Sequence, residues 1–240
     1  MDVVIVIPAY QPDNALLTLV KELQILTETP LIIINDGSTT SQAQKIFQQL
    51  NVMPHITCLT HHHNQGQGAA YKTAFNHILH TPNTYATIIT ADADGQHSPA
   101  DIMKLITCSK KNPQQVWLGC RQFTGKVPLK SLLGNHFFKW LMYYCYGYTL
   151  SDTQSGLRAI PLSIIPLLST LQCNRFDYST ELLITLFEHN IPFNEVPIDT
   201  IYINNNKSTH FRPFLDSVRI LKLFLSHSLK KCLPITKREK

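Results

Sequence analysis

Short apolar runs alternate with segments of helical periodicity in the first half of the chain. Apolar residues recur at helical spacing from Leu16 to Leu26, and further helices are predicted to end at about Leu50 and to cover 69–79 and 102–109. Each apolar run is predicted to be a strand. Val3–Ile7 and Leu31–Ile34 are typical of strands buried on both faces, and Pro8 is expected to end the first. The alternation predicts an α/β fold, with a mostly parallel sheet flanked by helices. The runs are Val3–Ile7, Leu31–Ile34, His55–Leu59, Tyr85–Ala91 and Val116–Gly119.

The pattern changes after Arg121. Helices are predicted over 129–148, which is rich in aromatic residues, and over 178–189, and a strand over 196–203. The polar stretch 204–209 separates that strand from an amphipathic helix over 214–229. We expect one domain over 1–213, with halves 1–120 and 121–213, followed by a basic helix and tail over 214–240. Phe214, Val218, Leu221, Leu225 and Leu229 share one stripe of that last helix, which either packs on the domain or lies on an anionic membrane.

Composition narrows the functional classes. The 240 residues are 44% hydrophobic and 15% charged, which is enough apolar material for a core. The net charge of +5 is concentrated near the C-terminus, without the basic stripe and interleaved aromatics of a nucleic-acid-binding protein. The six cysteines lack zinc or disulfide spacing and indicate a reducing compartment. The absence of a leader or long apolar span predicts a cytoplasmic protein, free or peripheral on the inner face of the membrane.

Two acidic residues follow the apolar run that ends at Ala91. Asp92 and Asp94 are spaced i, i+2, so in an extended chain they point to the same side. A divalent cation with oxygen ligands would relieve their repulsion and bind substrate phosphates, and Gln96 adds a neutral oxygen. The alternative is a solvated acidic turn before the helix that starts at Ser98.

Other polar residues follow predicted strands. Ligands of parallel sheets bind beyond the carboxyl ends of the strands, so Tyr10, Asp36 and the two acids should line one edge. Asp36 could accept hydrogen bonds from the N–H edge of a nucleobase, or it could simply cap a turn. Arg121 follows the fifth predicted strand, and with Lys126 and Lys130 it could bind a diphosphate or a phosphorylated lipid; ordinary surface charge is the alternative.

Several loops have two interpretations. The glycine-rich stretch 64–70 either lets backbone approach a ligand or is a flexible helix entry, and His61–His63 is predicted to be a solvated loop. Asp152 could act as a general base towards an acceptor hydroxyl or orient it, or form a buried pair with Arg158. The loop 202–213 could close over phosphates and supply His210 as a late metal ligand, or remain a disordered surface loop.

The ordered motifs IPAY, NDGS, DADGQH, GCR, SDTQSGLR, TELL and EVPI resemble a family-2 glycosyltransferase of the GT-A fold. The resemblance runs from about Val3 to about Phe214 and is strongest to the dolichyl-phosphate and polyprenyl-phosphate sugar synthases. The chain departs from the usual pattern in two places. Asn35-Asp36 replaces a pair of acids, and NNNKSTHFRP replaces the late arginine-containing loop.

The resemblance implies inverting transfer from a UDP- or GDP-linked sugar with Mn²⁺ or Mg²⁺, to an acceptor such as a polyprenyl phosphate or another membrane-associated molecule. Residues 1–120 would form the nucleotide-sugar half and 121–213 the acceptor half. Asp152 would be the base or orient the acceptor, and Asp94, Gln96 and His210 would bind the metal. The implied nucleotide-sugar-binding residues are Pro8, Ala9, Tyr10, Asp36, Asp92, Ala93, Asp94 and Arg121.

The sequence leaves two alternatives to a glycosyltransferase. Haloacid-dehalogenase-type phosphatases also place DxDG after a strand, but there the motif opens the first strand, and here it follows the fourth. A non-catalytic protein that binds sugar nucleotides on the same fold is the other alternative. Donor binding without transfer would distinguish it from an enzyme.

Overall fold

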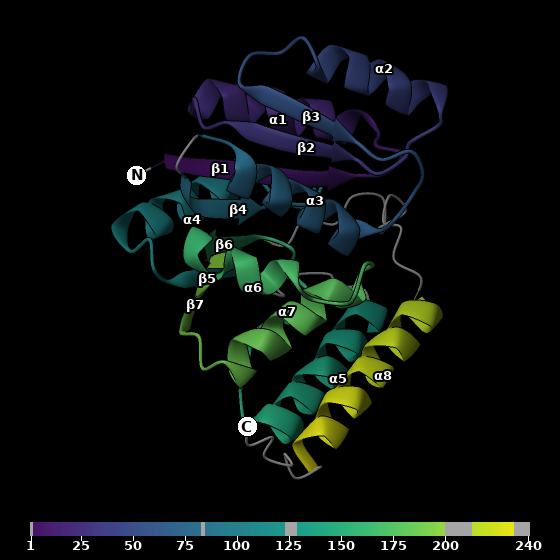
Figure 1. Cartoon of the computed structure of the whole chain (residues 1–240), viewed down its shortest axis with the longest axis vertical. Helices are drawn as coiled ribbons and strands as arrows, with labels where there is room; N and C mark the ends of the chain where they lie inside the picture. The colour runs from purple at the N-terminus through teal and green to yellow at the C-terminus, as the bar shows by residue number, and fades with distance from the viewer. Residues whose placement is uncertain (1, 83–84, 123–128, 200–212, 233–240) are drawn as a thin grey trace, which may run out of the picture.

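A computed structural model describes residues 2–82, 85–122, 129–199 and 213–232, without the side chains of 129–134, 213–217 and 228–232. Its centre is a seven-stranded sheet in the order β3-β2-β1-β4-β6-β5-β7 (Figure 1). All the pairings are parallel except those of β6, which runs antiparallel to β4 and β5. The strands are β1 Asp2–Ala9, β2 Leu31–Asn35, β3 Ile56–Thr60, β4 Tyr85–Thr90, β5 Val116–Arg121, β6 Arg158–Pro161 and β7 Phe193–Ile198.

Helices cover both faces of the sheet, and each face has its own apolar core. One core joins the sheet to the first, second and fourth helices, and the other joins it to the remaining longer helices. The predicted α/β class and mostly parallel sheet are therefore confirmed. The helices are α1 Asn14–Leu26, α2 Ser41–Leu50, α3 Gln67–His80, α4 Pro99–Lys111, α5 Leu129–Tyr146, α6 Ile165–Ser169, α7 Asp177–Glu188 and α8 Pro213–Cys232, with a 3-10 turn η1 over Leu162–Ile164.

Three details of the sheet differ from the prediction. β1 continues through Pro8 to Ala9, because proline lacks only one donor and can lie near a strand end. The last strand is Phe193–Ile198 in place of the predicted 196–203, of which 200–203 lie outside the described residues. β6 was not predicted, since its four residues follow a polar turn and are too few to show a period.

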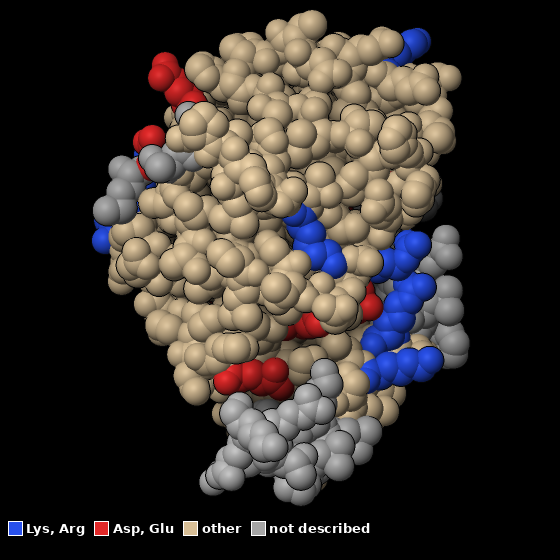
Figure 2. Space-filling model, viewed as in Figure 1, with Lys and Arg blue, Asp and Glu red and all other residues tan. Residues whose placement is uncertain are grey.

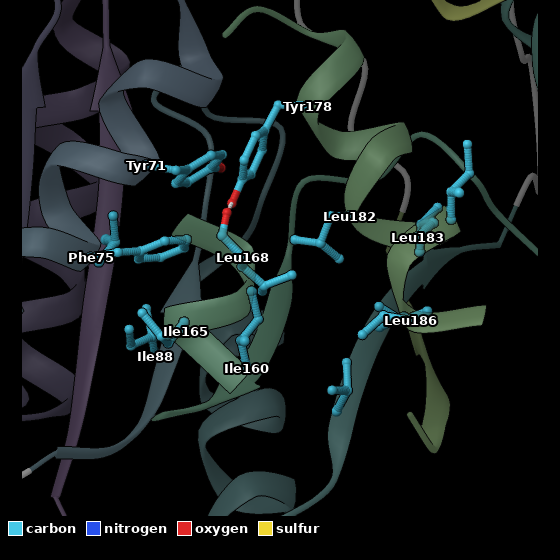
Figure 3. Packing of buried hydrophobic residues seen from close by; sticks show 14 of the residues in the cluster. Tyr71, Phe75, Ile88, Ile160, Ile165, Leu168, Tyr178, Leu182, Leu183 and Leu186 are labelled. Atoms are coloured by element: carbon cyan, nitrogen blue, oxygen red, sulfur yellow. Dashed lines mark hydrogen bonds between the residues drawn. The ribbon is translucent and has the colours of Figure 1, made fainter. Parts of the chain in front are cut away.

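The helices of the second half of the chain pack together below the sheet (Figure 1). α3, α6 and α7 meet through large apolar side chains, and the Tyr178 hydroxyl donates to the Leu168 carbonyl at 3.1 Å (Figure 3). α8 packs against α7 and α5 (Figure 1). Its buried side chains include Ile220 and Phe224, whereas Val218, Leu221 and Leu225 of the predicted stripe are exposed.

For these three residues the packing alternative is wrong, because the helix turns a neighbouring stripe towards the core; the membrane alternative stays a prediction. Among the described residues, no helix is both long enough and apolar enough to cross a membrane.

Candidate active site

The polar residues singled out in the sequence lie at one edge of the sheet. β1, β2 and β4 are parallel, and β5 runs the same way because β6 is antiparallel to both β4 and β5. Their carboxyl ends therefore share an edge, as predicted. Tyr10, Asp36, Asp92 and Arg121 stand at or directly after these ends.

Asp92 and Asp94 lie in the loop after β4, not in an extended strand as the prediction assumed. Asp94 is in a turn, where its Oδ1 accepts the Gln96 N–H at 3.1 Å. Asp92 Oδ1 accepts the Gln67 side-chain amide at 2.8 Å, and 27% of the Asp92 side chain is exposed. The intervening Ala93 is also partly exposed. The two carboxylates thus reach the same edge through a turn and not through strand alternation.

The two acids are costly to ionise together. Burial, followed by the negative charge of Asp92, raises the pKa of Asp94 to about 6. Burial also raises the pKa of Asp92, although the positive charges of Arg158 and Arg121 oppose that shift. A bound cation would favour the ionised form of both groups, because it compensates for lost hydration and for their mutual repulsion.

The neutral His97 side chain holds the loop after β4 by a hydrogen bond. Its Nδ1 accepts the backbone N–H of Asp92 at 3.0 Å, which requires an unprotonated Nδ1. Burial lowers the pKa of His97 to about 4, so the ring remains uncharged at neutral pH. The ring therefore fixes the backbone of Asp92 and adds no charge to the site.

Asp36 is saturated by donors from its own chain. The buried carboxylate accepts from His61 Nδ1 at 2.7 Å and from the Asn64 side-chain amide at 3.0 Å. The backbone N–H groups of Gln65 and Gly66 donate to it as well, each at 2.8 Å. A carboxylate has about four acceptor positions, so these bonds fill them. Asp36 organises the loop 61–66, and a nucleobase N–H would have to share or replace a bond.

The predicted solvated loop was wrong for His61. This side chain is buried, and its Nε2 contacts the Thr73 hydroxyl at 2.8 Å. Both ring nitrogens are therefore used within the protein. The neighbouring histidines, His62 and His63, are exposed as expected.

Residues after β1 and β2 are joined by a second set of bonds. Pro8 and Ala9 are buried at the end of β1, and Tyr10 follows them half-exposed. The Gln11 side chain contacts the Thr39 hydroxyl at 3.0 Å and accepts the Thr40 hydroxyl at 2.7 Å. The Asp36 turn is therefore tied to the end of β1.

Arg121 and Asp152 form a buried bidentate pair. Arg121 Nε donates to Asp152 Oδ2 at 2.6 Å and Nη2 donates to Oδ1 at 3.0 Å. The alternative of an Asp152–Arg158 pair is therefore wrong; Arg158 instead donates to the Ser179 carbonyl at 3.1 Å. Burial opposes ionisation of Asp152, but the hydrogen bonds from Arg121 outweigh it and lower the pKa of the carboxyl.

The turn around Asp152 is braced from two elements. The Ser151 N–H and hydroxyl both donate to Glu195 of β7 at 2.6 Å. The Thr153 N–H and hydroxyl donate to Asn135 of α5, at 3.1 and 3.0 Å. Asp152 is thus fixed relative to the sheet and to the helix below it.

Gly156 lets this turn approach the acids after β4. A Cβ at this position would lie 2.6 Å from Asp92 Oδ2 and 2.7 Å from Oδ1. Any larger residue would have to displace the carboxylate. The Thr90 hydroxyl donates to the Gly156 carbonyl at 2.7 Å, which secures the close approach.

The donor set fits a hard divalent cation that is shared with a substrate. Within the described ranges there is no cluster of three or more His, Cys, Asp or Glu side chains that could bind a metal alone. Mg²⁺ is commonly bound by one or two carboxylates and completed by water and substrate phosphates. Asp94, with Gln96 beside it, supplies such a partial site. His210 and Lys126 lie outside the described residues, as does the side chain of Lys130.

Comparison with known proteins identifies the family of this chain. Residues 4–162 match the family described as Glycosyl transferase family 2. The chain belongs to that family. It is a glycosyltransferase, which overturns the phosphatase alternative.

Two of the curated relatives of this transferase are named for polyprenyl phosphates. The UDP-N-acetylglucosamine–dolichyl-phosphate N-acetylglucosaminyltransferase of Methanococcus voltae is 30% identical, over 82% of this chain and 85% of the relative. The undecaprenyl-phosphate 4-deoxy-4-formamido-L-arabinose transferase of Photorhabdus laumondii is 26% identical, over 71% of this chain and 51% of the relative. The predicted resemblance to the polyprenyl-phosphate branch is confirmed.

Solved structures confirm the GT-A fold. The glucosyl-3-phosphoglycerate synthase of Mycobacterium tuberculosis, solved with Mn²⁺, UDP and phosphoglyceric acid, matches 98% of this chain and 80% of its own, with a TM-score of 0.67 and 13% identity. The same synthase with Mg²⁺ and UDP also has a TM-score of 0.67, at 13% identity over 98% of this chain and 81% of its own.

The sequence did not single out several residues that shape the site. Gln67 and Gly156 lie within stretches that were noted, but their contacts with Asp92 depend on the packing of distant segments. Asn135 was missed, and Glu195 lay in the quoted motif EVPI without an assigned role; each contacts the Asp152 turn from an element far away in the chain.

Proposed function

We propose that this glycosyltransferase moves a sugar from a nucleoside-diphosphate sugar to a polyprenyl phosphate, with inversion and with Mn²⁺ or Mg²⁺. The observation that carries the proposal is Asp94, whose pKa is raised to about 6 beside Asp92 at the carboxyl edge of β4. A carboxylate destabilised in this way gains most from a cation that neutralises it. The donor's diphosphate would supply the remaining ligands.

On the donor side, Asp94 and Gln96 would bind the metal, with His210 as a candidate third ligand. When bound, the ion acts as a Lewis acid that neutralises charge on the departing diphosphate. Asp92 would contact the nucleoside with its free oxygen positions, and the end of β1 from Pro8 to Tyr10 would line the base. Asp36 would act through the loop 64–66, because its own acceptor positions are filled.

On the acceptor side, the lowered pKa of Asp152 favours an acceptor that is already anionic. A carboxylate paired with Arg121 is a weak base, so it is poorly suited to remove a proton from a hydroxyl. A phosphate acceptor needs no such step. Asp152 would fix the Arg121 guanidinium, which would face the phosphates of the bound substrates.

Transfer would be a single in-line displacement. An oxygen of the acceptor phosphate bonds to the anomeric carbon from the face opposite the leaving group, and the bond to the diphosphate breaks with its electron pair. This chain's residues position both phosphate groups and stabilise the charge that develops.

The names of the relatives support the substrates. The Methanococcus voltae relative is named for a UDP-linked donor and a dolichyl-phosphate acceptor, and the Photorhabdus relative for an undecaprenyl-phosphate acceptor. A uridine donor and a polyprenyl-phosphate acceptor are therefore the first pair to test. Residues 121–213 would form the acceptor half.

The test has two steps. Thermal unfolding is measured with UDP- and GDP-linked sugars, with and without Mn²⁺, because a ligand that binds the folded state raises the midpoint. Donors that stabilise the protein are then incubated with a polyprenyl phosphate in detergent. We expect a metal-dependent shift and a glycolipid product. A metal-dependent shift without transfer to any polyprenyl phosphate would favour the non-catalytic alternative, and no shift with any donor would refute the donor assignment.

A further inference from the structure

The outward face of α5 is covered with aromatic side chains. Phe137, Trp140, Tyr143 and Tyr144 are all exposed, with Trp140 57% and Tyr144 76% accessible. The opposite face buries Phe138, Leu141 and Met142. A surface helix of a globular protein normally presents polar residues to water. A helix that is apolar on both faces indicates that something covers the outer one.

The neighbouring helix extends the apolar surface. α8 contacts α5 through Tyr146 and Phe224, whose ring centroids are 6.2 Å apart. Its exposed side chains include Val218, Leu221 and Leu225, which share one stripe of the helix. Seven of the eleven exposed large apolar side chains in the described part of the chain lie on these two helices. On an ordinary protein surface exposed apolar residues are scattered singly, whereas here most of them are gathered on two neighbouring helices.

The same two helices are basic. α5 contains two lysines and no acidic residue, and α8 contains four basic residues and one aspartate. Figure 2 shows Lys and Arg side chains along the side of the molecule where these helices lie in Figure 1. The surface therefore combines aromatic rings, aliphatic side chains and positive charge.

We infer that the outward faces of α5 and α8 dock on an anionic lipid bilayer. Tyr and Trp have an apolar body and a polar tip, which suits the boundary between headgroups and acyl chains. Basic residues near that boundary are attracted by anionic lipids. A second copy of the chain fits less well, because a two-fold interface would place two positively charged surfaces against each other.

The contacts of α5 connect this surface to the acceptor side of the site. Asn135 on this helix accepts two hydrogen bonds from Thr153, the residue next to Asp152. Trp140 is five residues further along the helix, a rise of about 8 Å. Docking through α5 would therefore bring Asp152 close to the depth of lipid phosphates. The inference deepens the proposed transfer to a lipid-linked acceptor and rests on it for this last step alone.

The experiment measures binding without any donor. The full chain is sedimented with vesicles of phosphatidylcholine alone and of phosphatidylcholine with phosphatidylglycerol. We expect binding to the anionic vesicles, weakened by salt, and a loss of at least about tenfold in the Trp140→Ser, Tyr144→Ser double variant. The matched control is Ile25→Ser with Val52→Ser, which removes side chains that are 83% and 84% exposed elsewhere and should leave binding unchanged.

Fluorescence gives a second readout. The chain has two tryptophans, so Trp117→Phe leaves Trp140 as the single reporter. Its emission should shift to shorter wavelength when anionic vesicles are added. Wild-type-like binding by the double variant, or an unshifted Trp140 spectrum in bound protein, would overturn the inference. A dimer in light scattering that the double variant abolishes, without vesicle binding, would assign the surface to a second copy.

The inference and the proposed function can fail separately. If both hold, the double variant keeps its activity on a short, water-soluble prenyl phosphate and loses activity on acceptor embedded in vesicles. Normal vesicle binding with no transfer to either acceptor would refute the function and leave the docking surface. Transfer to both acceptors by the double variant at wild-type rates would refute the docking surface and leave the function.

Discussion

At the scale of single residues, the surroundings of Asp94 and Asp152 shift the pKa values of their carboxyl groups in opposite directions. Burial and a neighbouring acid raise the pKa of Asp94 to about 6, whereas the bidentate pair with Arg121 lowers the pKa of Asp152. Surroundings that shift the pKa values of two carboxyl groups in opposite directions suit the two groups to different tasks. In the proposed function Asp94 binds the cation, whereas Asp152 remains an anion that fixes the Arg121 guanidinium.

The first prediction concerns that fixed pair. Asp152→Asn leaves the Arg121 guanidinium without its charge partner in a buried position, which should cost about 3 kcal/mol of folding stability. Turnover should fall strongly while donor binding persists, because the proposed function places Asp152 on the acceptor side. Chemical denaturation, steady-state kinetics with varied acceptor and donor thermal shifts measure the three effects.

A double variant tests the interpretation. Asp152→Asn combined with Arg121→Gln removes both charges, so part of the stability should return without recovery of turnover. Recovery of turnover along with stability would show that the pair is only structural.

A second prediction concerns the close approach of Gly156 to Asp92. Gly156→Ala would place a methyl group 2.6 Å from Asp92 Oδ2, so the carboxylate must move. Because the end of a side chain can shift more easily than backbone, we expect a folded protein whose donor affinity is at least about tenfold weaker. Unfolding midpoints check the fold and calorimetric titration with the donor nucleotide checks affinity. Unaltered affinity would mean that Asp92 does not contact the donor.

At the scale of elements, the N-terminus of α4 fixes the loop that holds the acids. Ser98 caps the helix, and its hydroxyl donates to the buried Asp101 carboxylate at 2.7 Å. Asp101 also accepts from Lys104 at 2.7 Å and from the backbone N–H of Asp199, after β7, at 3.2 Å. One carboxylate thus joins the helix that follows the acids to the strand at the far side of the sheet.

A third prediction follows for stability and its pH dependence. Asp101→Asn should cost about 1–2 kcal/mol, because it weakens a cap and charge-assisted bonds at a buried position. Burial raises the pKa of Asp101, but the bonds from Lys104, Ser98 and Asp199 outweigh it, so the folded pKa lies below 3.8. The stabilisation is therefore present above pH 3.8 and disappears as the pH falls through the folded pKa.

Denaturation between neutral and acid pH measures this contribution. Wild type should lose stability relative to Asp101→Asn as the pH falls below about 4, so that the two curves converge. The matched control, Lys104→Ala, should cost less because that side chain is 49% exposed. A constant difference between wild type and Asp101→Asn at every pH would contradict the assignment.

The elements that the sequence predicted well are those with a long apolar period. The apolar pattern lies within the element's own residues in β1, β2, β4 and α1. The sequence therefore predicted the bounds of these elements to within a few positions. β6 shows no such pattern, because its four residues are specified by partners on either side. α8 was predicted as a helix, but whether its apolar stripe packs on the domain or faces a membrane was left open, since only the packing on α5 and α7 selects which stripe is buried.

At the scale of the whole molecule, the shared edge was predictable and its internal pairings were not. Parallel strands bring their carboxyl ends together, so Asp36, Asp92 and Arg121 could be grouped from the sequence. The partner of Asp152 could not be read from spacing, because Arg121 is 31 residues away and Arg158 is nearer in sequence. The saturation of Asp36 likewise depends on a loop some 30 residues further along.

The most direct test of the account is the Mn²⁺ dependence of donor binding and transfer in Asp94→Asn, with Asp2→Asn as an exposed control. Wild type and the control should show a donor-dependent thermal shift that requires Mn²⁺, together with transfer. In Asp94→Asn that shift should vanish, and turnover should fall by at least about a hundredfold with the fold retained. A folded Asp94→Asn variant that keeps its Mn²⁺-dependent shift and near-normal turnover would contradict the claim that this carboxylate binds the cation.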